Sequence, residues 1–234
     1  AHILLIHISQ SRFDGEQSSG TNTLRQVRRK YRRSHFSPNP AKALLWLVLE
    51  DLPALRIKRE EIIEVGVGEF GSAYLLNGGT LTGFDVQAPV REIPELQGID
   101  SVDFRLLDIT RQRLPCRADL VFCVEVLGIT AGFDHARYFE AIEEMVNAVK
   151  PGGSIVFNTG SQLPDGTEGE ERIRKLLAGR FGDLEALVYG AFGLVRFNRR
   201  FSRLIALIMR SVPQLRRIPL WHNRRVLWVA DSRL

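Results

Sequence analysis

Short apolar runs alternate with amphipathic stretches along most of this chain. The apolar runs are bounded by Gly, Asp or Pro and predict seven strands, over residues 62–65, 81–84, 102–107, 120–124, 155–157, 184–189 and 226–229. Residues 37–40 (SPNP) predict the start of a helix whose apolar face is Leu44, Leu45, Val48 and Leu49, and further helices are predicted over residues 72–76, 135–149, 170–177 and 197–211. Strands that alternate with helices are typical of a parallel sheet covered on both faces. We therefore predict an α/β chain with a doubly wound, mostly parallel seven-stranded sheet and helices on both faces.

The charge of the chain is unevenly distributed. Its 234 residues carry a net charge of +5, and that small excess divides into +5 over residues 1–50, −9 over residues 51–185 and +9 over residues 186–234. Charge asymmetry of this kind concerns binding partners rather than fold. We divide the chain into a basic N-terminal extension or cap, residues 1–40, and one main domain, residues 41–234, with a basic helical insert at about residues 192–224.

Composition excludes several classes of protein. No stretch approaches the roughly 20 apolar residues of a spanning helix, and the opening run over residues 3–8 lacks the basic flank and length of a signal peptide. Cys116 and Cys123 are the two cysteines, too few for a disulfide framework or a four-ligand zinc pattern. We therefore expect a reducing, cytoplasmic setting.

A glycine-rich segment follows the first predicted strand. It reads Glu64-Val65-Gly66-Val67-Gly68-Glu69-Phe70-Gly71, and Asp85 ends the next strand, 19 positions after Gly66. Glycines at such a turn let the backbone approach a ligand closely, and an acid at the next strand end can accept hydrogen bonds from ribose hydroxyls. The spacing within a strand–turn–helix context predicts a Rossmann-like domain with a nucleotide-type cofactor at this turn.

Two cofactors fit the glycine segment. Gly66, Gly68 and Gly71 satisfy the dinucleotide fingerprint, so an NAD(P)-dependent oxidoreductase is one interpretation. Glu64, however, would repel a pyrophosphate and attract an ammonium group. The carboxylate therefore favours a nucleoside that carries an amino acid.

The segment from residue 61 to 160 resembles the class I S-adenosylmethionine-dependent methyltransferases. Glu64-x-Gly66-x-Gly68 looks like the family's first motif, residues 118–127 (ADLVFCVEVL) look like its fourth-strand motif, and residues 150–156 (KPGGSIV) are similar to its turn before the fifth strand. The chain departs from many members at Phe70, where they have Gly, and at Gly128-Ile129, where they have Glu-His.

The resemblance implies S-adenosyl-L-methionine as the cofactor. It places Glu64 and Gly66 at the methionine end, Asp85 at the ribose and Asp108 at the adenine amino group. The cofactor-binding residues that it implies are Glu64, Gly66, Val67, Gly68, Gly71, Asp85, Asp108, Ile109 and Val124.

Methyl transfer from a sulfonium is a direct displacement, so positioning and exclusion of water are the main tasks of the protein. An alcohol or phenol acceptor also benefits from a general base. His135 and Glu125, near predicted strand ends, are the candidate catalytic residues, with Asp134 and His222 as further candidates. No metal site is expected, because no cluster has metal-ligand spacing.

The basic insert contains an amphipathic helix. Its apolar residues are Phe197, Phe201, Leu204, Ile205 and Ile208, and its basic residues are Arg199, Arg200, Arg203 and Arg210. Three interpretations stay open: a helix packed on the core with a solvated arginine face, a lid over an apolar or lipid-like substrate, and a helix on an anionic membrane surface.

We expect a methyltransferase that acts at an O, N or C atom of a small, anionic or lipid-like acceptor. An RNA methyltransferase ranks below it, because aromatic side chains are not clustered with the basic runs and nucleic acid is not an expected partner. A catalytically inactive binding or membrane-associated module is the third interpretation.

Overall fold

The computed structural model describes residues 40–67, 75–87, 99–127, 135–160, 165–189, 199–212 and 225–232. Its centre is a seven-stranded sheet with the order β3-β2-β1-β4-β5-β7-β6. The strands are β1 (Arg59–Val65), β2 (Gly78–Asp85), β3 (Ile99–Leu106), β4 (Ala118–Cys123), β5 (Val149–Thr159), β6 (Asp183–Tyr189) and β7 (Arg225–Asp231). All neighbours are parallel except the pairs that β7 makes with β5 and β6. The predicted mostly parallel, doubly wound α/β sheet is confirmed.

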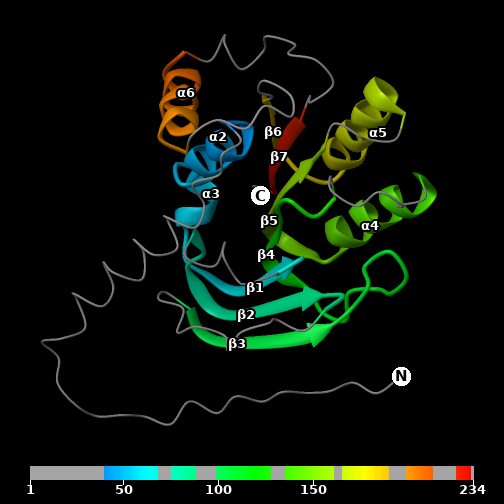
Figure 1. Cartoon of the computed structure of the whole chain (residues 1–234). Coiled ribbons are helices and arrows are strands. Elements are labelled where there is room, and N and C mark those ends of the chain that lie inside the picture. Colours follow the sequence, from blue (N-terminus) through cyan, green and yellow to red (C-terminus); the bar gives the residue numbers. More distant parts are fainter. Residues whose placement is uncertain are drawn as a thin grey trace, which may run out of the picture.

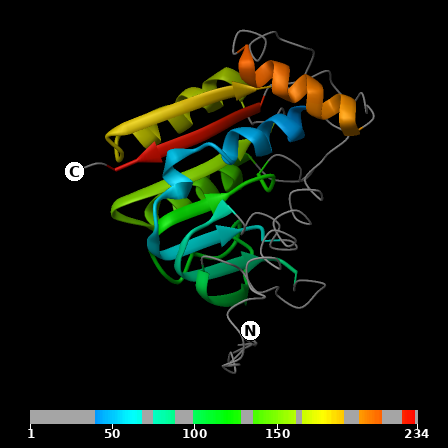
Figure 2. The ribbon, with the colours of Figure 1, turned by 90° about the vertical axis from the view of Figure 1, so that its left-hand side faces the viewer.

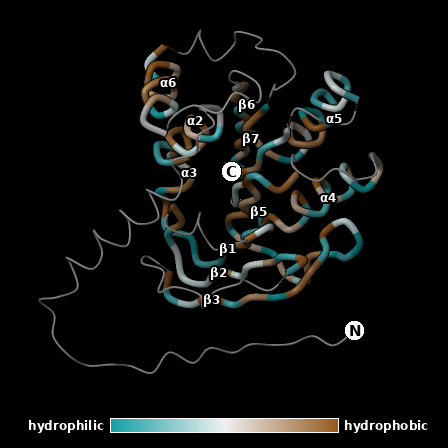
Figure 3. The backbone as a smooth tube through the Cα atoms, in the orientation of Figure 1, coloured by the Kyte–Doolittle hydropathy of each residue, from teal (hydrophilic) through white to brown (hydrophobic). Residues whose placement is uncertain are grey.

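Helices cover both faces of this sheet (Figure 1). On one side lie α2 (Pro40–Leu49), α3 (Pro53–Arg56) and α6 (Arg199–Ser211), and on the other lie α4 (His135–Asn147) and α5 (Gly166–Ala178). Each face encloses its own cluster of buried apolar side chains. Brown, hydrophobic segments accordingly follow the strands and the helices that pack on them (Figure 3). A sheet buried on both faces explains why its central strands are short, continuous apolar runs.

The fifth strand starts earlier than the sequence predicted. The predicted helix over residues 135–149 ends at Asn147, and β5 begins at Val149, which pairs with Ala118. The strand then passes through Pro151-Gly152-Gly153, where Gly152 adopts a φ of +78° and the pairing register with β4 shifts. Gly at a positive φ lets the strand bulge and continue instead of ending.

The face of α6 that packs on the core is not the predicted apolar face, which the first of the three interpretations placed on the core. Ser202, Ala206 and Met209 are its buried side chains, whereas Phe201, Leu204 and Ile208 of the predicted apolar face are exposed. Figure 2 shows α6 lying alongside α2. Two of the three buried residues are small, which allows close approach, and Ile205 of the predicted apolar face is partly buried and packs against the core.

Parts of several predictions fall outside the described residues. These are the N-terminal extension over residues 1–39, most of the helix predicted over 72–76, and the ends of the basic insert. None of the described helices has the length and apolar character needed to cross a bilayer.

Candidate active site at the carboxyl edge of the sheet

The predicted cofactor motif begins at β1, next to the topological switch point of the sheet. From β1 the sheet grows outward through β2 and β3, and the chain then returns to place β4 on the other side of β1. Glu64 of β1 lies level with Gly83 of β2 and with Phe122 of β4. In open α/β sheets, ligands bind at the carboxyl ends of the strands at such a switch point.

Gly66 is the first residue after β1, and its backbone has a φ of +74°. Its N–H donates to the carbonyl oxygen of Phe84 at 2.7 Å, which ties the turn to the end of β2. A Cβ atom at this position would lie 2.0 Å from Cγ2 of Val126, just after β4. We expected glycine here to leave room for a ligand. In the structure, the turn also needs glycine because Val126 fills the adjacent space.

Glu64 is a buried carboxyl group, 2% exposed. Its burial, and next the nearby Asp85 carboxylate, raise its pKa from 4.5 to about 8. Near neutral pH the uncharged acid therefore predominates in this structure, and a ligand cation beside it would favour the ionised form. Glu64 would therefore carry its negative charge when a ligand ammonium group lies beside it, and would favour the uncharged form beside a pyrophosphate.

Asp85 ends β2, as predicted, and is half-buried. Its Oδ1 accepts a hydrogen bond from the backbone N–H of Gln87 at 3.2 Å. Two carboxyl groups, Glu64 and Asp85, therefore lie at adjacent strand ends and make this part of the edge acidic. Val67 and Val124, two other predicted cofactor residues, are buried, whereas Gly68 and Gly71 lie outside the described residues.

Asp108 follows β3 and organises the turn there. Its Oδ1 accepts hydrogen bonds from the backbone N–H of Thr110 at 3.0 Å and from the Thr110 hydroxyl at 2.6 Å, and Arg111 pairs with its Oδ2 at 3.4 Å. Ile109 between them is buried. These are the contacts of a turn residue, and the predicted contact of Asp108 with an adenine amino group stays a prediction.

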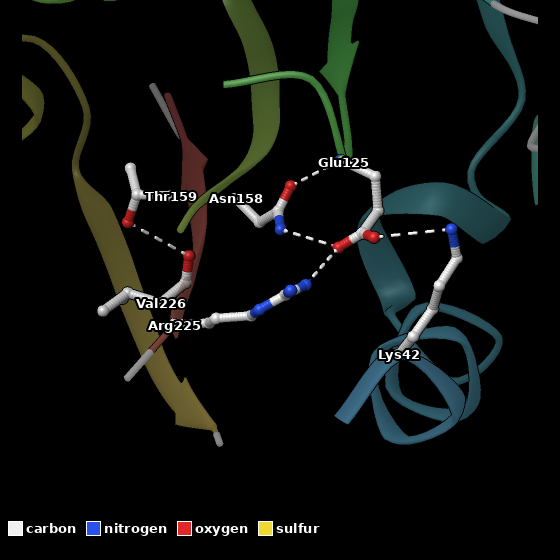
Figure 4. A network of polar contacts seen from close by, with 6 residues as sticks. All are labelled: Lys42, Glu125, Asn158, Thr159, Arg225 and Val226. Atoms are coloured by element: carbon white, nitrogen blue, oxygen red, sulfur yellow. Dashed lines mark hydrogen bonds and ion pairs between the residues drawn. The ribbon is translucent and has the colours of Figure 1, made fainter. Parts of the chain in front are cut away.

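Glu125, predicted as a candidate catalytic residue, is the centre of a polar network (Figure 4). Arg225 donates to its Oε1 at 2.8 Å, the Asn158 side-chain amide donates to the same oxygen at 3.3 Å, and Lys42 Nζ lies 3.5 Å from Oε2. The backbone N–H of Glu125 donates to Asn158 Oδ1 at 2.6 Å. Its φ of +65° is uncommon for a residue other than glycine. Strained backbone of this kind is concentrated at functional sites.

Residues from three distant elements meet at Glu125. Lys42 comes from the first turn of α2, Asn158 from the end of β5 and Arg225 from the start of β7. The sequence patterns did not identify Lys42, Asn158 or Arg225 as site residues. No local pattern marks them, because each is adjacent to Glu125 only through the pairing of the strands and the packing of α2.

The other predicted bases are less well defined. His135 is the first residue of α4, and its side chain lies outside the described part of the structure. Asp134 and His222 also fall outside it. Within the described ranges, no three His, Cys, Asp or Glu side chains gather into a group that could hold a metal ion.

Comparison with known proteins identifies the family of the central segment. Residues 63–157, which run from β1 to β5 and include Glu64, Gly66, Asp85 and Asp108, match a family model described as a methyltransferase domain. A search of curated protein sequences finds no match.

Two similar solved structures share this architecture. The N-methyltransferase NodS from Bradyrhizobium japonicum WM9, in complex with S-adenosylhomocysteine, is 15% identical over 83% of this chain and 89% of its own, with a TM-score of 0.50. The structure described as StiE O-MT, residues 942-1257, is 16% identical over 81% of this chain and 74% of its own, with a TM-score of 0.51. At this identity the likeness shows the fold. The methyltransferase domain matched over residues 63–157 and this shared fold are consistent with the class I S-adenosylmethionine-dependent methyltransferases that the motifs resemble.

Proposed function

We propose that this methyltransferase acts on an O, N or C atom of a small acceptor that carries an anionic group. The observation behind this proposal is the convergence of Lys42 and Arg225 on Glu125. The network therefore holds two cations and one carboxylate. A carboxylate or phosphate on the acceptor would complement the two cations.

The position of the network supports an acceptor site. Val126, which follows Glu125, packs against Gly66 of the cofactor motif. The cations therefore lie beside the turn that the family resemblance assigns to the methionine end of the cofactor. An acceptor bound at Lys42 and Arg225 would be close to the methyl group that is transferred.

Arg225 has capacity for a further contact. Its side chain is 20% exposed, and Nη1 is engaged by Glu125. Its Nε is buried and has no hydrogen-bond partner among the described residues. A buried donor without a partner is costly, so an acceptor oxygen or a water that reaches Nε would be stabilising.

Glu125 itself fits a positioning residue better than a general base. Its carboxylate oxygens are engaged by Arg225, Asn158 and Lys42, and its side chain is 12% exposed. A carboxylate held in this way orients the two cations. His135, which begins α4, stays the proposed base for a hydroxyl acceptor, and a His135→Gln variant that kept its full rate on such an acceptor would exclude that role.

The chemistry divides between cofactor and protein. Bound S-adenosylmethionine would supply a methyl group on a sulfonium, ready for displacement. Glu64 would bind its ammonium group and Asp85 its ribose hydroxyls, whereas Arg225 and Lys42 would orient the acceptor. Holding the two reactants in line is the main contribution that such a reaction needs from a protein.

The first test is calorimetric titration with S-adenosylhomocysteine, with NADH in parallel. We expect binding of S-adenosylhomocysteine alone. Binding of NADH alone would favour the dinucleotide interpretation of the glycines and overturn the proposal.

A second titration tests the acceptor class. Inorganic phosphate added to the S-adenosylhomocysteine complex should bind to the wild type and lose affinity in Arg225→Gln, by roughly 1.5–3 kcal/mol for a hydrogen bond between charged groups. Arg56→Gln is the matched control, because Arg56 also pairs with an acid, Asp51, but lies at the amino end of β1. Equal phosphate affinity in the wild type and Arg225→Gln would exclude Arg225 as an anion contact.

The cytoplasm stays the predicted location, because both cysteines are free thiols.

A further inference from the structure

The surface of α6 divides into faces of different character. Ser202, Ala206 and Met209 are buried against the core. A second face, with Val212 directly after the helix, carries what we call the apolar stripe, which consists of Phe201, Leu204, Leu207, Ile208 and Val212. These five side chains are between 38% and 52% exposed. Large apolar side chains gathered on one face of a helix commonly mark an interaction site.

Arginines accompany the apolar stripe. The helix contains Arg199, Arg200, Arg203 and Arg210 and no acidic residue. Arg203 is exposed, whereas Arg210 pairs with Asp51, just after α2. Arg210 therefore helps to fix the helix on the body of the protein, with the apolar stripe turned outward. The orientation of the stripe follows from the packing of the helix, because the face with Ser202, Ala206 and Met209 is turned toward the core.

We propose that α6 docks on the surface of an anionic phospholipid bilayer, with the apolar stripe inserted at the boundary between headgroups and acyl chains. An amphipathic helix with apolar residues on one face and arginines beside them binds such surfaces through apolar burial and attraction to anionic lipids. The helix has no acid that would oppose this attraction. The proposal is independent of the acceptor and goes beyond the methyl transfer itself.

Charge argues against two other occupants. A second copy of the chain that docked stripe to stripe would bring together two helices with four arginines each and no acid, and like charges across an interface are destabilising. Nucleic acid would be attracted by the arginines, but single strands are bound largely through stacked aromatic side chains, and Phe201 is the one aromatic residue of α6.

Docking would bring the active site toward the lipid. The segment that contains α6 leaves the sheet after β6, at Tyr189, and returns to it at Arg225, the first residue of β7. Because β6 runs parallel to β5 and β7 runs against both, these two ends lie at the carboxyl edge. The segment that contains α6 therefore leaves and re-enters the sheet at the same edge that carries Glu64 and Glu125.

Vesicle co-sedimentation of the full chain tests the proposal. The wild type should sediment with vesicles of phosphatidylcholine that contain phosphatidylglycerol, and should not sediment with vesicles of phosphatidylcholine alone. Leu204→Ser combined with Ile208→Ser should reduce the partition coefficient at least about tenfold, because two apolar side chains no longer enter the bilayer. Ile57→Ser is the matched control, since Ile57 is 49% exposed and Ile208 46%, and only Ile208 belongs to α6.

A charge variant separates electrostatic attraction from apolar insertion. Arg203→Gln should lower partition to the anionic vesicles roughly fivefold, whereas Lys58→Gln, an exposed lysine far from α6 in sequence, should change it little. Circular dichroism verifies that each variant is folded. Failure of the wild type to sediment, or equal sedimentation of the wild type and the double variant, would overturn the proposal. The proposal would also be overturned if the wild type formed a dimer or bound RNA, and the double variant lost that dimer or RNA complex while its vesicle binding was unchanged.

Discussion

Glu64 and Glu125 occupy comparable places but have opposite surroundings. Each lies at the carboxyl end of a central strand, β1 or β4, and each is largely buried. Asp85 lies near Glu64, and the effect of burial and of that second carboxylate is a pKa raised to about 8. Glu125 instead has Arg225 at 2.8 Å and Lys42 at 3.5 Å. The cation that Glu64 would bind has to come from a ligand, whereas the cations that Glu125 binds belong to the protein.

The difference divides one sheet edge into an acidic and a basic part. The acidic part, at β1 and β2, suits a cofactor with an ammonium and a sulfonium group. The basic part, at β4, β5, β7 and α2, suits an anionic acceptor. Charges of opposite sign in adjacent subsites would keep the two reactants from exchanging places.

The largest effect is expected at the boundary between the two parts. Gly66→Ala adds a Cβ that overlaps Val126 Cγ2 at 2.0 Å on a backbone with a φ of +74°, so strain and overpacking together should lower the free energy of unfolding by about 2–4 kcal/mol. Urea denaturation measures this loss, and affinity for S-adenosylhomocysteine should fall with it. Gly152→Ala is the control, since its φ is +78° but nothing lies within 4 Å of the added Cβ. It should cost only about 1 kcal/mol. Equal losses in the two variants would mean that Val126 yields and that the two parts of the edge are not coupled there.

The next effect concerns the acidic part and depends on pH. If the ammonium of S-adenosylhomocysteine binds ionised Glu64, binding releases a proton below the raised pKa. Affinity should then increase with pH, up to about tenfold per pH unit, and level off near pH 8. Glu64→Gln should remove this dependence and weaken binding at pH 8 by roughly 1.5–3 kcal/mol. Calorimetry at several pH values measures both, and a wild-type affinity that is constant between pH 6 and 8 would contradict the role of Glu64.

Glu64 should also make the free energy of unfolding depend on pH, in the direction opposite to that of the ligand affinity. Because the pKa of Glu64 in the empty folded protein lies above its unfolded value of 4.5, the folded state holds the proton more tightly. The contribution of Glu64 to the free energy of unfolding should therefore decrease as pH rises from about 4.5 to about 8 and stay constant beyond. Glu64→Gln should be more stable than the wild type at pH 9 while binding the cofactor less well. Asp85→Asn, which removes the second cause of the raised pKa, should move both transitions to lower pH.

The smallest effect distinguishes the two cations of the basic part. Arg225→Gln should lower the free energy of unfolding by about 1–2 kcal/mol, because a largely buried Glu125 loses its closest charge partner but keeps Asn158 and Lys42. Lys42→Gln should cost less than about 1 kcal/mol, since the lysine is 39% exposed and its pair with Glu125 is longer. Thermal or urea denaturation of both variants measures the difference. Similar losses would show that Lys42 and Arg225 hold Glu125 equally.

The motif at the acidic part could be predicted from the sequence because it is local. Glu64 and Asp85 lie on consecutive strands, and the turn chemistry of Gly66 is visible as a residue type. The raised pKa of Glu64 could not be predicted, since it depends on how β2 and β4 enclose that side chain. The basic part was missed because Arg225 is 100 positions from Glu125 and Asn158 is 33 positions away.

For this protein, the sequence by itself determined the order of strands and helices, the sheet class and the family to which the cofactor motif points. These follow from periodicity and from glycine, proline and acidic residues at strand ends, which act over a few residues. Only the tertiary structure decided which face of α6 packs, where β5 begins and which cations reach Glu125. Amphipathicity shows that a helix has an apolar face, but the shape of the neighbour selects the face that is buried, and in α6 that face carries Ser202, Ala206 and Met209.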